Sequence, residues 1–365
     1  MLNRRHFIEK LALGSGTLIL TKANPSFLEE KKLGIALVGL GNYATNQLAP
    51  ALLETLNCKL TGIVTGTPAK EEKWAKQYNI PKKNIYNYQN FDTIKNNPDI
   101  DIVYVVLPNA MHAEYTIRAA KAGKHVICEK PMALNVQECK EMIKACNDHK
   151  VKLSVGYRLY FEPHHLEMRR LGTEKVYGSV RMIESSLGFS MADPKIWRLN
   201  KALGGGGAIM DLGVYCIQGA RRTIGELPVS VTAQGFIRDK TIFKDIYEGI
   251  TFQMNFPSGA ISNSTTTYTS YVDRLHATTG YQWYTLQPSF NATGAKGEFL
   301  NDNKAQPMSF KTKAFQQIDQ MDDFVKCIRE NKVSIASGEE GMTDLKIIEA
   351  IKESADRGGT VKLMW

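Results

Sequence analysis

The sequence lacks the patterns that mark several protein classes. Its six cysteines form neither a C-x-x-C pair nor a Cys/His zinc spacing, which argues against a disulfide scaffold and a structural zinc site. The apolar stretch from Leu11 to Leu20 falls short of the roughly 20 residues that span a bilayer. No basic helix or basic patch with interleaved aromatic residues suggests nucleic-acid binding. What is present is ordinary globular composition, 43% hydrophobic and 23% charged over 365 residues, which indicates about two domains.

The N-terminus has the pattern of an export signal. Arg4-Arg5 is followed by Phe7 and then by the short apolar stretch, as in twin-arginine signals, whose pathway exports folded proteins. We therefore expect residues 1–31 to be a signal and a short arm, and the protein to be periplasmic or otherwise exported, without stable membrane association afterwards. Alternatives are a basic helix on a cytosolic protein and an uncleaved anchor. Of the net charge of +9, +3 lies within residues 1–23.

A dinucleotide-binding fold is predicted for residues 32–155. The apolar run from Lys32 to Leu40 indicates a buried parallel strand, and G-x-G-x-x-A follows it as Gly39 to Ala44, before a helical stretch. In that motif the first glycine makes a tight turn, the second admits a pyrophosphate, and the small last residue allows close helix–strand packing. The expected binding residues in the loop are Gly39, Gly41, Asn42, Tyr43 and Ala44.

The end of the second strand (residues 60–65) favours NADP over NAD. NAD sites place an Asp or Glu there to hold the ribose 2′-hydroxyl. Here the chain reads Thr65-Gly66-Thr67-Pro68-Ala69-Lys70, so a hydroxyl and a lysine are available to accept a 2′-phosphate. We predict that Thr65, Gly66 and Lys70 bind the cofactor; the alternative is that Lys70 is a solvated residue of the helix over 69–78.

Further strands are expected at residues 102–107, 125–128 and 153–156, alternating with helices at 113–122 and 136–149. Such alternation is typical of a doubly wound parallel sheet, whose ligand binds at the carboxyl ends of the strands. Leu107, Pro108, Asn109 and Glu129-Lys130 follow those ends. His112 precedes a helix and is assigned either a hydrogen bond near a nicotinamide or a capping or packing role.

Residues 156–365 read as an α+β domain with a large open, mainly antiparallel sheet. Segments 176–186, 229–236, 250–256 and 260–268 are rich in β-branched and aromatic residues, and helices at 315–329 and 341–355 are expected to pack back on the body. A run of four glycines (Gly204 to Gly207) leads into a helix that carries Asp211 and Tyr215. These two lie at i and i+4, on one helix face, where a carboxylate and a phenol suit a sugar or polyol; the alternative is an Asp at a helix start beside a packed Tyr.

Together these motifs resemble the glucose–fructose oxidoreductase/inositol dehydrogenase (Gfo/Idh/MocA) family, and within it the glucose–fructose oxidoreductase branch. The resemblance rests on the glycine fingerprint, Leu107-Pro108-Asn109 with His112, Glu129-Lys130-Pro131, Trp197-Arg198, and the glycine run through Asp211 to Tyr215. It covers essentially the whole chain from residue 33.

The resemblance implies hydride transfer between a sugar or polyol carbon and a nicotinamide, with Lys130, Asp211 and Tyr215 as catalytic residues. Tyr215 exchanges a proton with the reacting oxygen, Lys130 orients the substrate and assists the phenol, and Asp211 binds a sugar hydroxyl. Arg158, Trp197, Arg198 and Tyr281 are candidates to line the cofactor or sugar site. No metal is expected.

The sequence thus predicts an exported sugar oxidoreductase with tightly bound NADP, acting by glucose–fructose or aldose–aldose exchange. Segment 24–32 is short for the arm that embraces a neighbouring subunit and helps retain NADP in the family's best-known member, so ordinary dehydrogenase behaviour stays open. Alternatives are an NAD-dependent glycosidase of the same fold and a non-enzymatic sugar or cofactor sensor. We expect sugars as partners, no nucleic acid, and a homodimer or homotetramer formed through the open sheet.

Overall fold

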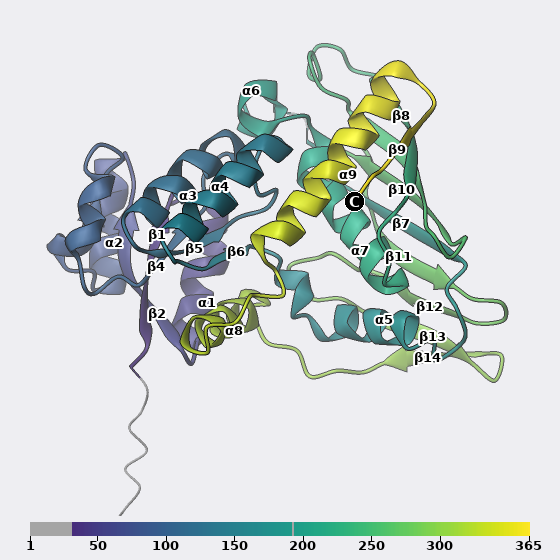
Figure 1. Cartoon of the computed structure of the whole chain (residues 1–365), viewed down its shortest axis with the longest axis horizontal. Coiled ribbons are helices and arrows are strands. Elements are labelled where there is room, and N and C mark those ends of the chain that lie inside the picture. The colour runs from purple at the N-terminus through teal and green to yellow at the C-terminus, as the bar shows by residue number, and fades with distance from the viewer. Residues whose placement is uncertain (1–30, 192) are drawn as a thin grey trace, which may run out of the picture. The chain divides into compact units, whose positions relative to one another are not determined.

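The computed structural model describes residues 31–191 and 193–365, and two β-sheets organise this part of the chain (Figure 1). The predicted export signal therefore lies outside the described residues. Within the described ranges, no helix combines the length and apolar character needed to cross a membrane. All six cysteines are buried and free, and in the same ranges no cluster of His, Cys, Asp and Glu could hold a metal ion.

The first sheet has six parallel strands in the order β3-β2-β1-β4-β5-β6. This is the strand order of a dinucleotide-binding doubly wound fold, and it confirms the predicted architecture. The short strand β3 was not predicted. The strands are β1 (Leu33–Val38), β2 (Cys58–Val64), β3 (Ile85–Tyr86), β4 (Ile102–Val105), β5 (His125–Cys128) and β6 (Leu153–Val155).

Helices cover both faces of this sheet because its strands are apolar on both sides. Ala36 and Val38 of β1 face the core under α3 and α4, whereas Ile35 and Leu37 face the core under α1 and α2. The helices of this half, together with one π-helical turn and short 3-10 turns, are η1 (Ala44–Leu48), α1 (Ala49–Glu54), α2 (Pro68–Tyr78), η2 (Lys82–Asn84), η3 (Phe91–Asn96), η4 (Asn109–Met111), α3 (His112–Lys121) and α4 (Val136–Asp148).

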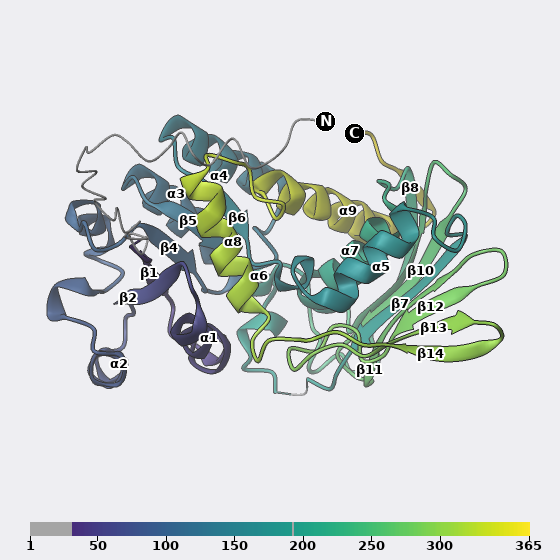
Figure 2. The same cartoon turned by 90° about the horizontal axis from the view of Figure 1, so that it is seen from below.

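A helix from the C-terminal part of the chain, α8 (Gln317–Arg329), completes the second of these layers. Its residues Ile318, Met321 and Phe324 join the core under β1, and Figure 2 shows α8 beside the parallel sheet near α1. The Asp322 carboxylate accepts hydrogen bonds from the backbone N–H groups of Leu56 and Asn57 at 2.7–3.0 Å, which ties α8 to the start of β2. The C-terminal helices thus pack back on the body, and α8 does so on the nucleotide-binding sheet.

The second sheet has nine strands in the order β14-β13-β12-β11-β7-β10-β9-β8-β15 and is antiparallel except for the parallel pair β7/β10. It confirms the predicted large, mainly antiparallel sheet. Its strands are β7 (Met182–Gly188), β8 (Ser230–Phe236), β9 (Gly249–Asn255), β10 (Ile261–Thr267), β11 (Val272–Thr278), β12 (Trp283–Leu286), β13 (Gly297–Asn301), β14 (Lys304–Met308) and β15 (Thr360–Lys362).

Helices α5, α7 and α9 lie on one face of the second sheet (Figure 1). On β9, Ile250, Phe252 and Met254 are buried towards those helices, while Thr251 and Gln253 alternate to the other face. This alternation is typical of a sheet with one packed face. The remaining helical segments are η5 (Arg158–Tyr160), α5 (Pro163–Thr173), η6 (Trp197–Leu199), α6 (Lys201–Gly204), η7 (Ile209–Gly213), α7 (Val214–Ile224) and α9 (Gly338–Arg357).

Candidate active site

The glycine loop after β1 has the geometry of a dinucleotide cradle. Gly39 has φ +96°, and a Cβ there would lie 2.5 Å from the Val106 carbonyl oxygen, so only glycine fits without strain. Gly41 is exposed, and a Cβ at that position would meet no atom within 4 Å. The helix begins at Asn42, and buried Ala44 starts its π turn. The structure therefore offers open space beside backbone N–H groups at a helix start, where a pyrophosphate binds.

The end of β2 lies next to this loop. Lys70 of α2 donates a hydrogen bond from Nζ to the Leu40 carbonyl oxygen at 3.0 Å, which places its charge at the glycine loop. Thr65 is buried, and its hydroxyl accepts a hydrogen bond from the Thr67 N–H at 3.3 Å, while Gly66 is exposed. The predicted 2′-phosphate residues are thus gathered at one place, and no carboxylate stands between Thr65 and Lys70.

The loop after β4 links the two sheets through a buried hydrogen bond. Asn109 is buried and donates from Nδ2 to the Gly204 carbonyl oxygen at 2.9 Å. Both ring nitrogens of buried His112 lie 2.9 Å from backbone carbonyl oxygens, those of Leu107 and Pro131, and burial lowers the pKa of His112. Both ring nitrogens face backbone carbonyl oxygens, and the neutral ring can donate to one of them, which favours the packing alternative for His112.

Three consecutive glycines shape the turn that leads to the helix carrying Asp211 and Tyr215. Gly205, Gly206 and Gly207 all have positive φ, and a Cβ on Gly207 would lie 2.8 Å from the Tyr247 carbonyl oxygen. The Lys352 ammonium donates to the Gly205 carbonyl oxygen at 2.9 Å. The chain then enters the π-helical turn η7, which carries Asp211, and continues as α7, which carries Tyr215. Such π turns often occur at functional sites.

Lys130, after β5, contacts both residues of that helix. Its ammonium lies 3.1 Å from Oδ1 and 2.7 Å from the main-chain oxygen of Asp211, and 4.6 Å from the centroid of the Tyr215 ring. Asp211 and Tyr215 therefore share one helix face, as the spacing predicted. The structure brings the three predicted catalytic side chains together at the carboxyl edge of the parallel sheet.

The electrostatics of this cluster keep its ion pair charged. Burial of Asp211 raises its pKa, but the Lys130 and Arg198 cations outweigh burial and lower the pKa to about 2. Burial acts to lower the pKa of Lys130, but the Asp211 carboxylate and Tyr215 together outweigh burial and raise the pKa. An anionic acceptor and a cationic donor are thus fixed side by side across a wide pH range.

The second oxygen of Asp211 also has partners. The Nε atom of Arg198 lies 3.2 Å from Oδ2, and the guanidinium carbon lies 4.4 Å from the centroid of the Trp197 ring. Trp197 therefore packs against Arg198 and helps to position it beside Asp211. Tyr268, after β10, donates its hydroxyl to the same oxygen at 3.1 Å. Sequence reasoning missed Tyr268; it lies at the end of the predicted strand 260–268, which is the only signal the sequence offered.

Arg158 is a second cation close to Tyr215. Its guanidinium carbon is 5.3 Å from the Tyr215 ring centroid, and it donates to the Phe290 carbonyl oxygen at 2.6 Å and to the Gln316 side chain. Arg158 is buried, so this cation is fixed rather than solvated. Two cations, Lys130 and Arg158, therefore lie close to the phenol ring of Tyr215.

Glu129 accepts a hydrogen bond from the backbone of Lys130 and helps to fix its position. It is buried, accepts the Tyr104 hydroxyl at 2.7 Å and the Lys130 N–H at 3.2 Å, and burial raises its pKa. A Cβ on Gly156 would lie 2.6 Å from the Glu129 carboxylate, so the glycine after β6 makes room for this carboxylate.

Tyr43 accepts a hydrogen bond from Gln317 of α8 at 2.9 Å, which joins the glycine loop to the C-terminal helix. Tyr104 and Gln317 carried no recognisable sequence signal.

One predicted site residue lies elsewhere. Tyr281 is 95% exposed in the turn between β11 and β12. Thr278, the last residue of β11, pairs with Met182 at the start of β7. The opposite end of β7 is the one near the site, because Gly188 there pairs with Thr267, which precedes Tyr268. The expectation that Tyr281 lines the site is therefore wrong for this chain, because β11 runs away from the site before it reaches the turn.

Known proteins share this two-sheet architecture. Residues 33–157 match an oxidoreductase family with an NAD-binding Rossmann fold, and residues 165–300 match the GFO/IDH/MocA C-terminal domain. The structure is similar to that of an aldose–aldose oxidoreductase from Caulobacter crescentus, with 40% identity, a TM-score of 0.89 and coverage of 91% of this chain and all of that one.

Two curated proteins extend the comparison over most of the chain. D-xylose 1-dehydrogenase [NADP(+)] from Haloarcula marismortui is 27% identical over 90% of this chain and 92% of its own length. Inositol 2-dehydrogenase from Rhizobium meliloti is 27% identical over 84% and 92%. Both family domains are present, in order, around one site, and the chain belongs to the Gfo/Idh/MocA family of oxidoreductases.

Proposed function

We propose that this protein is an NADP-containing sugar oxidoreductase that moves a hydride between an aldose, ketose or related polyol and the nicotinamide, by an aldose–aldose or glucose–fructose type of exchange. The observation that carries the proposal is the position of the Lys130 ammonium, 3.1 Å from the Asp211 carboxylate and 4.6 Å from the Tyr215 ring centroid. The names of the aldose–aldose oxidoreductase and NADP-linked xylose dehydrogenase relatives agree with it.

The protein's own groups account for the proton in this reaction. When a sugar is oxidised, Tyr215 takes the proton of the reacting hydroxyl, and when a sugar is reduced it returns a proton to the carbonyl oxygen. The charges of Lys130 and Arg158, 4.6 and 5.3 Å from the ring centroid, stabilise negative charge on the Tyr215 oxygen while the proton moves. Asp211 accepts a hydrogen bond from a sugar hydroxyl, and the bound nicotinamide supplies or accepts the hydride.

The residues present fit NADP. The space over Gly41 and the helix that begins at Asn42 suit the pyrophosphate, and Lys70 at the loop suits a 2′-phosphate. A carboxylate at the end of β2 would repel that phosphate, and the chain has Thr65-Gly66-Thr67 there. We propose that the cofactor stays bound between turnovers, since the exported location that the N-terminus predicts offers little free NADP.

We also propose that the protein is exported by the twin-arginine route and that it forms a dimer or tetramer through the open face of the second sheet. Thr251 and Gln253 lie on that face, which carries no helix among the described residues. Analytical ultracentrifugation of the mature protein, with charged substitutions on that face, tests the assembly.

A spectroscopic experiment tests the function. The purified protein is examined at 340 nm after addition of glucose and then of fructose or a second aldose. Bound cofactor should be reduced by the first sugar and reoxidised by the second, and the Tyr215→Phe variant should keep its NADP but lose both changes. A protein without bound nucleotide that responds to no aldose would reject the proposal. Cleavage of a glycoside without net redox change would favour the glycosidase, and sugar binding without turnover the sensor.

A further inference from the structure

Three buried glutamines at the start of α8 contact groups of the candidate site. Gln316 is the N-terminal cap of the helix, and Gln317 and Gln320 lie in its first turn. The helix itself is anchored on the nucleotide-binding sheet, because its apolar face joins the core under β1 and Asp322 binds the start of β2 (Figure 2). A group bonded to one of these glutamines is therefore held in place relative to that sheet.

Gln320 is linked to Lys130 through two further side chains. Its Nε2 donates to the Tyr104 hydroxyl at 2.9 Å, and this hydroxyl donates to the Glu129 carboxylate at 2.7 Å. Glu129 in turn accepts the N–H of Lys130 at 3.2 Å. Because the hydroxyl hydrogen of Tyr104 is used on the carboxylate, its oxygen can only accept, and the amide must present its nitrogen here. Gln320 therefore fixes the direction in which Tyr104 donates.

Gln317 makes the same kind of contact with the glycine loop. Its Nε2 donates to the Tyr43 hydroxyl at 2.9 Å. Burial and the nearby Glu129 carboxylate raise the pKa of Tyr43, so this phenol stays protonated. Because the oxygen of Tyr43 already accepts from Gln317, its hydrogen is directed away from α8 and can be donated to a ligand bound at the loop.

Gln316 contacts the cation beside Tyr215. Its Oε1 accepts a hydrogen bond from the Arg158 guanidinium, whose carbon lies 5.3 Å from the Tyr215 ring centroid. Its Nε2 donates to the Asn291 carbonyl oxygen at 3.2 Å. Hydrogen bonds from the start of one helix thus reach the glycine loop, the segment of Lys130 and the neighbour of Tyr215.

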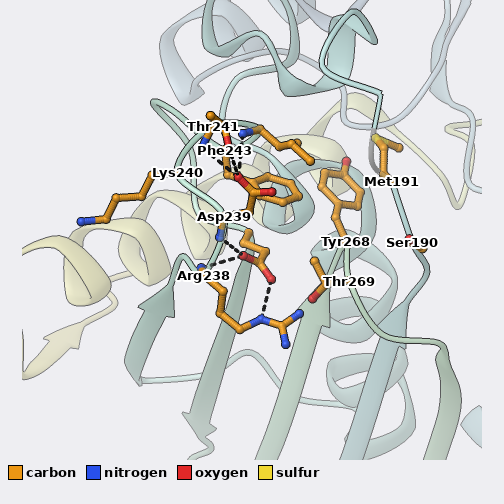
Figure 3. Close-up of a pocket in the computed structure, with 11 residues that line it drawn as sticks. Ser190, Met191, Arg238, Asp239, Lys240, Thr241, Phe243, Tyr268 and Thr269 are labelled. Atoms are coloured by element: carbon orange, nitrogen blue, oxygen red, sulfur yellow. Dashed lines mark hydrogen bonds and ion pairs between the residues drawn. The ribbon is translucent and has the colours of Figure 1, made fainter.

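Packing alone does not account for these amides. Buried Glu248 illustrates a side chain kept for structure, since both its oxygens accept hydrogen bonds, from the N–H groups of Arg238 and Asp239 and from Arg238 Nε (Figure 3). In contrast, the Oε1 atoms of Gln317 and Gln320 have no hydrogen-bond partner in the part of the chain that the structure describes. Burial of a half-paired amide is unfavourable, and methionine would fill the same space without it. The contact that each Nε2 makes with a tyrosine is therefore the feature that distinguishes these side chains from apolar ones.

We propose that Gln317 and Gln320 are positioning residues for the hydride transfer. Gln317 fixes the glycine loop through Tyr43. Gln320 fixes Lys130 through Tyr104 and the neighbouring carboxylate. The inference rests on the proposed function, because that function assigns hydride transfer to this site. Since both residues act through others, their loss should slow the reaction by misplacing the reacting groups and leave sugar affinity unchanged.

The test replaces each amide by an apolar side chain of similar length. In Gln317→Met and Gln320→Met, reduction of the bound cofactor by glucose, followed at 340 nm by stopped flow, should be about tenfold slower than in the wild type. The sugar concentration that gives half the maximal rate should stay within about twofold, and the melting temperature within about 3 °C, because the lost hydrogen bond is offset by removal of a half-paired amide. Unchanged rates, or slower reduction together with a much lower melting temperature, would overturn the positioning role.

The control is Gln77→Met on α2. Gln77 is exposed, and its Nε2 donates to the Tyr78 hydroxyl at 3.0 Å, so the variant removes the same kind of contact away from the site and should keep the wild-type rate. Combining Gln320→Met with Tyr104→Phe should be no slower than Tyr104→Phe alone, because both changes remove one contact. Losses that multiply in the double variant would contradict the link through Tyr104.

Hydrogen exchange separates this proposal from the proposed function. If no sugar reduces the bound cofactor, the proposed function fails, yet exchange still tests the positioning. On samples with matched dinucleotide content, Gln317→Met should speed amide exchange in residues 39–44 by about fivefold, and Gln320→Met should do so at residues 129 and 130, with α4 unchanged. Wild-type exchange at both places, or faster exchange throughout the protein, would reject the proposal, whatever the activity.

Discussion

Replacement of Asp211 by Asn removes one charge from the centre of the site while keeping its shape. The carboxylate lies between the Lys130 ammonium at 3.1 Å and Arg198 at 3.2 Å, and accepts the Tyr268 hydroxyl. The Asp211 side chain is 13% exposed and that of Lys130 is 12%, so solvent screens this pair little. The substitution therefore isolates the electrostatic contribution of one carboxylate.

The pKa gives the magnitude of the effect. The pKa of Asp211 is about 2, against an ordinary value of 3.8. Each pKa unit corresponds to roughly 1.4 kcal/mol, so the charged carboxylate stabilises the folded protein by about 2 kcal/mol near neutrality. Arg198, whose side chain is 36% exposed, contributes the smaller share because water reaches it.

The pH dependence has a definite sign. Because the folded pKa lies below the unfolded one, this stabilisation is complete above about pH 4 and is lost as the pH falls through about 2. About half of it should remain at pH 3. The difference in unfolding free energy between the wild type and Asp211→Asn should therefore shrink on acidification.

Urea denaturation at pH 7 and pH 3 measures this difference, on samples with matched dinucleotide content because bound ligand also stabilises. Asp245→Asn, on an exposed loop, is the control and should stay within about 0.5 kcal/mol of the wild type. A double-mutant cycle with Lys130→Met should give a coupling of about 1–2 kcal/mol at pH 7. A coupling near zero, or a difference that does not change with pH, would refute the electrostatic account.

Three further predictions concern the cofactor side of the site. Lys70→Ala should weaken NADP binding by about tenfold and leave NAD unchanged in fluorescence titrations, because one charge-assisted hydrogen bond to the 2′-phosphate is lost; equal weakening of both would contradict its role. Gly41→Ala should fold normally but bind dinucleotide poorly, whereas Gly39→Ala should also lower the melting temperature, because only at Gly39 would the Cβ meet backbone; equal melting temperatures would contradict this. Burial raises the pKa of Glu129 above its ordinary value of 4.5, so this group's contribution to stability falls as the pH rises from 4.5 towards the folded pKa; Glu129→Gln should gain stability relative to the wild type over that range in urea titrations, and a constant difference would argue against a raised pKa.

The site lies where loops from both sheets meet, and this explains why its parts depend on each other. Asn109 of the nucleotide-binding half holds Gly204, and Lys352 of α9 holds Gly205, so the turn before Asp211 is fixed from two sides. Lys130 then reaches across from β5 to the same helix. A change in any of these contacts is expected to move Asp211 and Tyr215 relative to the glycine loop after β1.

The sequence by itself determined the parts of the protein that local patterns encode. Apolar runs such as Leu33 to Val38 specify buried parallel strands, and the G-x-G-x-x-A spacing specifies the cradle between β1 and its helix. The i, i+4 spacing of Asp211 and Tyr215 on one helix placed both on one face, where Lys130 contacts both. These features depend on residues close together along the chain.

Only the tertiary structure decided which distant residues complete the site. Tyr268 and α8 join it through contacts between segments far apart in sequence, to Asp211 and to Tyr43. It also placed Tyr281 in solvent and directed both nitrogens of His112 to backbone carbonyl oxygens. Periodicity reports which face of an element is buried, but strand order and direction, here the parallel β7/β10 pair and the path of β11, decide what that face meets.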